Sequence, residues 1–191
     1  MARWEPDAVG RLQQAALELY AEQGYDQTTV AEIAARAGLS ERTYFRHFTD
    51  KREVLFHGSE QLQEAIVSAV QDAPATTGPL DAIAQGLRRI APFFDERRPQ
   101  SLQRHQIVRS SRELQERELM KRGSMVTALA AALQRRGLDP TAAALAAESG
   151  ASVFHLAYVG WVEDPRGRSY AAHVDETLAS LRTLTVAAPV A

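Results

Sequence analysis

Cationic and hydrogen-bonding side chains are concentrated between Thr28 and Lys51. The spacing over residues 41–48 predicts a short helix with one polar face and one aromatic face. Arginine and hydroxyl groups can donate to base edges and to phosphates, and a short helix that carries them fits the major groove of DNA. The residues predicted to lie on the polar face are Glu41, Arg42, Thr43, Arg46 and His47.

Two packed helices are needed to position this face, and the sequence marks both. Thr29 and Glu32 form a capping box that predicts the start of one helix, which must stop at Gly38. Ser40 predicts the start of the next helix. A tight turn with glycine, a buried aliphatic residue and a polar cap is typical of a helix-turn-helix. The same spacing also fits two helices that only pack, and both interpretations stay open at this point.

Local charge favours the DNA interpretation, whereas the charge of the whole chain does not. Residues 36–52 contain five basic and two acidic side chains, which gives 5 − 2 = +3. The complete chain of 191 residues carries a net charge of −2 and has a pI near 6.2. Lys51 also lies at the start of a predicted helix, where backbone N–H groups can hold a phosphate.

The composition and the positions of Gly and Pro predict an all-α protein in two parts. Hydrophobic residues make up 45% and charged residues 24%, as in globular proteins, and good helix formers fill the segments between Gly and Pro breaks. The N-terminal part is predicted at residues 1–52 and the C-terminal part at 72–191, joined by a long helix over about 50–71 and a linker at 72–79. Further helices are predicted at about 79–95, 99–110, 111–136, 140–163 and 168–186.

The segment TTVAEIAARAGLSERTYFRHFTDKREVLF strongly resembles the N-terminal DNA-binding domain of the TetR (tetracycline repressor) family, over roughly residues 10–57. The resemblance implies a three-helix helix-turn-helix domain followed by a variable helical domain for ligand binding and dimerisation. It also implies a homodimer, a double-stranded and roughly palindromic DNA operator, and a small-molecule effector, in a regulator that is most often a repressor. The last two predicted helices, 140–163 and 168–186, would pair two protomers. Gly150, Ala151, Phe154 and Tyr158 on the first, and Val174, Leu178, Leu181 and Thr185 on the second, supply either that interface or intramolecular core.

Roles at individual positions follow from the same resemblance. Thr29 should cap its helix and donate to a phosphate, while His47 and Lys51 should hold the DNA backbone. Phe45 departs from the family pattern, which has Tyr there, so one phosphate contact is lost and Phe45 is left to pack on sugar or protein. The residues predicted to bind DNA are Thr28, Thr29, Ser40, Arg42, Thr43, Phe45, Arg46, His47 and Lys51.

The C-terminal part offers candidates for an effector site. Residues 97–122 contain eight basic and three acidic side chains, so 8 − 3 = +5, which fits either an anion site or a solvated face with helix ion pairs such as Glu113 with Arg117 and Glu118 with Arg122. The run RHQIVRSSRELQER resembles C-terminal domains of actinobacterial TetR-type regulators that bind acyl-CoA thioesters. The effector is therefore predicted to be acyl-CoA-like, or else a smaller hydrophobic molecule. The residues predicted to bind it, or else to form plain core, are Phe93, Phe94, Leu102, Arg104, Ile107, Arg109, Met120, Met125, Leu129, Val153 and Trp161.

Other functions find little support in the sequence. The chain has no cysteine, no glycine-rich phosphate loop and no hydrolase or zinc-protease motif, so we expect no enzyme activity, no cofactor and no metal. No apolar run is long enough to cross a bilayer, and the charged start MARWEPDAVG is unlike a signal peptide, so a cytoplasmic protein without a membrane partner is expected. The alternatives are a helical enzyme that uses the C-terminal cavity and a helical interaction protein without a ligand.

Overall fold

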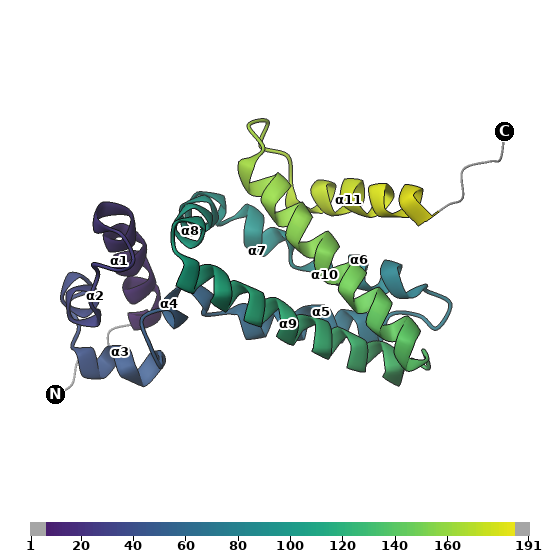
Figure 1. The fold of residues 1–191 in the computed structure, drawn as a ribbon, viewed down its shortest axis with the longest axis horizontal. Coiled ribbons are helices and arrows are strands. Elements are labelled where there is room, and N and C mark those ends of the chain that lie inside the picture. Colours follow the sequence, from purple (N-terminus) through teal and green to yellow (C-terminus); the bar gives the residue numbers. More distant parts are fainter. Residues whose placement is uncertain (1–6, 186–191) are drawn as a thin grey trace. The chain divides into compact units, whose positions relative to one another are not determined.

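The computed structural model describes residues 7–185, and residues 1–6, which begin the segment used for the localisation prediction, lie outside it. The described residues form helices and no strand, as predicted (Figure 1). The helices are α1 (Ala8–Gln23), α2 (Val30–Arg36), α3 (Glu41–His47), α4 (Glu53–Phe56), α5 (Ser59–Asp72), α6 (Pro79–Arg89), α7 (Ala91–Asp95), α8 (Arg98–Ser110), α9 (Arg112–Arg135), α10 (Pro140–Glu163) and α11 (Tyr170–Thr185).

The chain divides into two compact units, and the boundary is not a simple cut in the sequence. The N-terminal unit comprises residues up to 58 together with 99–119, and the second unit comprises 59–98 and the residues from 120 onward. The N-terminal core contains Leu12, Ile33 and Tyr44 from the first three helices, joined by Ile107 of α8 and Leu114 of α9. A predicted C-terminal segment therefore completes the core of the N-terminal unit.

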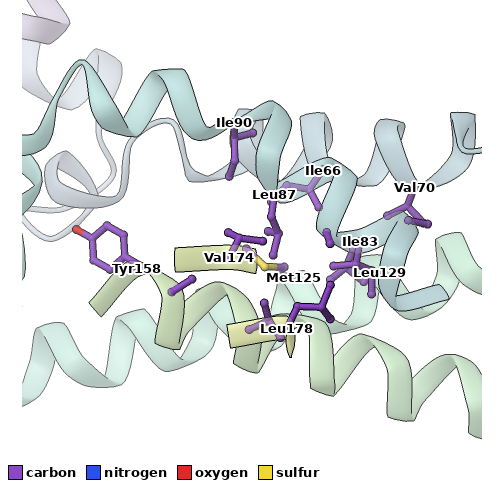
Figure 2. Packing of buried hydrophobic residues seen from close by; sticks show 14 of the residues in the cluster. Ile66, Val70, Ile83, Leu87, Ile90, Met125, Leu129, Tyr158, Val174 and Leu178 are labelled. Atoms are coloured by element: carbon purple, nitrogen blue, oxygen red, sulfur yellow. The ribbon is translucent and has the colours of Figure 1, made fainter. Parts of the chain in front are cut away.

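The second unit has its own core, formed by α5, α6, α7, α10 and α11 with part of α9 (Figure 2). Two glycines allow close helix packing in it. A Cβ at Gly86 of α6 would lie 2.9 Å from the Ile66 carbonyl oxygen of α5, and a Cβ at Gly150 of α10 would lie 2.7 Å from Ile83 Cδ1. Neither position therefore has room for a side chain unless its neighbours move.

Two predicted helices are each divided in the structure. The segment predicted as one helix over 50–71 forms α4 and α5, because the chain turns at Gly58, which adopts a φ of +87° that favours glycine. The segment predicted over 79–95 forms α6 and α7. Pro92 accounts for this second break because it has no N–H to continue the ladder of α6.

The segment 72–79, predicted as an interdomain linker, lies inside the second unit. Arg136, just after α9, donates from one guanidinium nitrogen to the Val70 carbonyl at 2.9 Å and to the Ala73 carbonyl. Its other terminal nitrogen donates to the carbonyls of Pro74 and Thr77, each at 3.0 Å. One side chain thus satisfies carbonyls at the end of α5 and in the loop that follows, and it fixes the path of that loop.

Candidate nucleic-acid interface

The turn between α2 and α3 is built from local caps, as the sequence predicts. Thr29 Oγ1 accepts from the Glu32 N–H at 3.2 Å, and the Glu32 carboxylate accepts from the Thr29 N–H at 2.8 Å. Ser40 Oγ accepts from the Thr43 N–H at 3.2 Å and so begins α3. Gly38 takes a φ of +67° in the turn, and Arg11 of α1 donates to the neighbouring Ala37 carbonyl. These bonds fix the orientation of α3 on α1 and α2.

The helix α3 has one buried and one exposed face. Tyr44 and Phe48 are buried, as predicted, with ring centroids 5.1 Å apart. On the opposite side Phe45 is exposed despite being aromatic, with 54% of its surface accessible. Most of the predicted DNA-binding set is exposed, namely Thr29, Ser40, Arg42, Phe45, Arg46 and His47, while Thr43 is half-buried. The exposed side of α3, formed by Arg42, Phe45, Arg46 and His47, is called the recognition face below.

Thr28 and Lys51 are placed differently from the rest of the predicted set. Thr28 is buried, and its hydroxyl donates to the Gly24 carbonyl at 2.8 Å, which closes the end of α1. The Lys51 ammonium donates to the carbonyls of Tyr25 at 2.9 Å and Thr28 at 3.2 Å, and it lies 4.1 Å from the centre of the Tyr25 ring. Two of the three N–H donors of the Lys51 ammonium are thus engaged within the unit.

Part of the positive charge expected around the turn is compensated inside the unit. Arg36 pairs with Glu22 at 2.8 Å and with Glu18 at 3.4 Å. Arg52 pairs with Asp50 at 2.8 Å, and this guanidinium lowers the pKa of the Asp50 carboxyl below its usual value. The cations that the recognition face itself presents are Arg42 and Arg46.

Buried tyrosines hold the start of α4 against this unit. Tyr20 Oη donates to the Lys51 carbonyl at 2.6 Å, and Tyr44 Oη donates to the Asp50 carbonyl at 3.3 Å. Burial raises the pKa of both phenols, so both stay protonated and can donate. Tyr25, in the loop after α1, donates from its hydroxyl to the Glu113 carboxylate of α9 at 3.1 Å.

The residues predicted to bind an effector are split between the two units. Leu102, Arg104, Ile107 and Arg109 belong to the N-terminal unit, whereas Phe93, Phe94, Met120, Met125, Leu129, Val153 and Trp161 belong to the second. Ile107 is buried in the N-terminal core, and Met120 is exposed. Arg104 donates to the Leu55 carbonyl at 2.8 Å and to Glu118 at 3.1 Å. The structure therefore does not gather this set within one unit.

The arginine-rich stretch 97–122 forms ion pairs, including Arg112 with Glu116 at the predicted i, i+4 spacing, but Arg117 and Arg122 contact other partners than the sequence spacing predicts. Arg117 pairs with Glu53 of α4 at 2.5 Å, where we expected Glu113. Arg122 donates to Ser152 Oγ at 3.0 Å, where we expected Glu118. Long-range packing brings these partners closer than the i, i+4 neighbours, which local spacing cannot reveal.

Six aromatic residues in the second unit contact one another and are called the aromatic cluster below: Phe93, Phe94, Phe154, Tyr158, Trp161 and Tyr170. Phe94 of α7 lies at its centre, with ring centroids 4.8 Å from Tyr170 and 5.6 Å from Trp161. Of these, Phe93, Phe94 and Trp161 were predicted as effector residues. Tyr170 was not singled out, because a lone Tyr at a predicted helix start gives no periodic signal.

Most of the residues predicted to supply either the protomer interface or the intramolecular core lie in the core of their own chain. Gly150, Ala151 and Tyr158 of α10 are buried within their own chain, as are Val174 and Leu178 of α11. A charge at Ala151, which is fully buried within its own chain, would disturb the fold. The large apolar side chains that these two helices expose are Leu145, Leu156 and Leu184.

Fold and site together define a helix-turn-helix protein with a second helical unit. Residues 12–57 match the family model described as bacterial regulatory proteins, tetR family. The transcriptional regulator TcmR of Streptomyces glaucescens is 40% identical over 75 residues, which span 39% of this chain and 33% of TcmR. The chain thus covers about a third of that relative. The N-terminal region of this chain is thus similar to the DNA-binding region of TetR-family regulatory proteins.

Two solved structures share the fold over most of the chain. Thermus thermophilus FadR, a TetR-family repressor in complex with lauroyl-CoA, is 20% identical with a TM-score of 0.57, and the match covers 96% of this chain and 98% of FadR. SmeT in complex with triclosan is also 20% identical, with a TM-score of 0.64 and coverage of 91% and 90%. No helix in the described range 7–185 is long and apolar enough to span a membrane.

Proposed function

We propose that this chain is a homodimeric transcription regulator that binds a roughly palindromic operator and is released from it by a small effector. The observation that carries the proposal is the recognition face. Its two arginines are exposed on a helix whose caps and buried aromatics fix its direction. Arginine read-out of guanine in the major groove uses this kind of rigid presentation.

The proposed dimer uses the exposed side of α10. Leu145 and Leu156 are more than half exposed and lie eleven residues apart, which places them on the same side of the helix. Two copies of such a side would bury both leucines. The operator half-sites of the proposed dimer are expected about one helical turn of DNA, or a multiple, apart. Leu145→Asp and Leu156→Asp should give monomers in analytical ultracentrifugation with unchanged circular dichroism, and dimers in both variants would contradict this interface.

The proposed effector is hydrophobic, with an acyl-CoA thioester as the preferred example and an uncharged drug-like molecule as the alternative. The similar fold of FadR, which is complexed with lauroyl-CoA, supports the first, and SmeT with triclosan supports the second. In the second unit Arg97 lies 4.5 Å from the centre of the exposed Phe93 ring, so a cation stands beside an aromatic surface. Arg104 and Arg109, proposed as contacts for an anionic group, belong to the other unit.

The test begins with an operator selected in vitro from random duplexes by the full chain. Arg42→Ala and Arg46→Ala should each weaken binding to that operator by about 1–3 kcal/mol if the side chain reads a base. Lys51→Ala should weaken specific and non-specific binding alike and reduce the salt slope by about one unit. Arg112→Ala is the matched control, because its guanidinium is almost fully exposed on α9. Parental affinity in all three test variants would overturn the proposal.

Release by the effector is tested on the same complex. A ligand shifts the equilibrium only if it binds the free conformation more tightly than the DNA-bound one, with a coupling of roughly 1–3 kcal/mol. Release by lauroyl-CoA but not by laurate would support the thioester, and loss of that difference in Arg104→Ala or Arg109→Ala would assign the anionic group to those arginines. Release by an uncharged apolar compound alone would support the alternative.

A further inference from the structure

Two polar atoms inside the aromatic cluster have no hydrogen-bond partner among the described residues: Trp161 Nε1 and Tyr170 Oη. Both side chains are fully buried, at 0% exposure. A buried donor without an acceptor is costly, and folded proteins rarely retain one without a reason. Here two such donors occur on neighbouring helices, with ring centroids 6.0 Å apart.

The chemistry of the two donors restricts what they can bind. An indole N–H can only donate. Burial holds the pKa of the Tyr170 phenol well above its ordinary value, so this hydroxyl stays neutral and donates as well. The pair therefore suits an acceptor oxygen.

The surroundings favour an uncharged acceptor over an anion. The donors are enclosed by the rings of Phe94, Tyr158 and each other, and such apolar walls penalise a charge more than a carbonyl. The guanidinium of Arg98 lies 5.3 Å from the Trp161 ring centre. Its terminal nitrogens donate to the backbone carbonyls of Trp161 at 2.6 Å, Asp164 at 2.5 Å and Arg168 at 3.1 Å, so they serve the connection between α10 and α11.

We propose that Trp161 and Tyr170 form a subsite for the carbonyl oxygen of an apolar ligand. This rests on the proposed ligand-responsive function and specifies which atom of the effector is recognised. The cluster reaches the surface at Phe93, which is 41% exposed and contacts Phe94 with ring centroids 5.7 Å apart. The Phe94 ring contacts this exposed ring as well as the rings of Trp161 and Tyr170.

The first experiment measures binding of matched probes to the full chain without DNA, by calorimetry. Fluorenone is compared with fluorene, and lauroyl-CoA with S-dodecyl-CoA, so that each pair differs only in the carbonyl. Each carbonyl compound that fits should bind roughly tenfold more tightly than its methylene partner. A preference in the lauroyl pair alone identifies an acyl thioester, and one in the fluorenone pair alone identifies a free ketone. Equal affinities within both pairs, or no binding by any probe, would overturn the proposal.

The second experiment removes each donor in turn. Tyr170→Phe keeps the ring, so it should lower the carbonyl preference several-fold while the melting temperature stays equal or rises, because an unpaired buried donor is gone. Trp161→Phe should also lower the carbonyl preference, but its melting temperature should fall because the smaller ring leaves a cavity at a fully buried position. Tyr20→Phe is the matched control: its hydroxyl donates to the Lys51 carbonyl at 2.6 Å, so its loss should lower the melting temperature. If Tyr170→Phe also lowers the melting temperature and leaves the carbonyl preference intact, the hydroxyl has a structural role and the subsite is refuted.

DNA binding is assayed separately on the same proteins. Carbonyl preference without release from the operator would keep the subsite and refute the effector role. Release from the operator by ligands that show no carbonyl preference would keep the proposed function and refute the subsite.

Discussion

The recognition face and the aromatic cluster differ in how their residues are held. Those of the recognition face depend on bonds between residues three apart, such as Thr29 with Glu32 and Ser40 with Thr43. The aromatic cluster depends on contacts between α7, α10 and α11, up to 76 residues apart in the case of Phe94 and Tyr170. Loss of one local bond should therefore lower the stability around the recognition face only modestly. Loss of one long-range contact should lower the stability around the aromatic cluster much more.

Loss of Arg98 should lower the free energy of unfolding the most. Arg98→Ala removes three charge-assisted hydrogen bonds to the carbonyls of Trp161, Asp164 and Arg168 at the α10–α11 connection, so we expect the free energy of unfolding to fall by about 2–4 kcal/mol. Arg97→Ala is the control, because this exposed neighbour pairs only with Glu96 and the Phe93 region among its recorded contacts. Equal urea midpoints for the two variants would remove the proposed contrast between long-range and local support.

A methyl group at Gly86 should have the next largest effect on the free energy of unfolding. Gly86→Ala places a Cβ against the backbone of Ile66, and separating α5 from α6 should cost about 1–3 kcal/mol. Gly123→Ala is the matched control in α9, where nothing lies within 4 Å of the added Cβ. That variant should gain about 0.5–1 kcal/mol, because alanine is the better helix former. Thermal unfolding of both variants checks the opposite signs, and a stabilised Gly86→Ala would contradict the packing of α5 on α6.

Removal of a local cap should have a smaller effect. Thr29→Ala removes the acceptor for the Glu32 N–H, with an expected loss of about 1 kcal/mol. Thr49→Ala, at an exposed position just after α3, serves as the control and should change stability by less than about 0.5 kcal/mol. Urea titrations that show no difference between these variants would mean that α2 is held by packing rather than by its cap.

Acid should weaken the second unit through Asp164. The Arg166 N–H and the Arg168 guanidinium lower the pKa of this carboxyl, so its folded-state pKa lies below the unfolded value of about 3.9. The stabilisation is then present above that value and is lost as pH falls through the folded pKa. Asp164→Asn should flatten the decline of unfolding free energy between about pH 5 and pH 2. An unchanged slope would assign the acid sensitivity to other carboxylates.

The same difference between local and long-range support explains what the sequence could predict. Residue spacing predicts that helices start at Thr29 and Ser40 and that α3 has a buried side. The structure agrees. The split of the predicted effector residues could not be foreseen, because α8 and the start of α9 belong to the N-terminal unit. The same holds for Tyr170, whose role depends on α7 lying against α11. The break at Gly58 had a local signal, since a glycine inside a predicted helix is a common site of interruption.

The loop held by Arg136 bears on where this protein can be cut or extended. A Pro-, Thr- and Gly-containing stretch such as 72–79 looks like a natural place for protease cleavage or for inserting a tag. Its carbonyls at Ala73, Pro74 and Thr77 are instead bound by one guanidinium. Cleavage requires a segment of several residues to leave its position, so this loop should resist a protease of broad specificity such as subtilisin. An inserted tag there would displace Arg136 and leave the end of α5 uncapped.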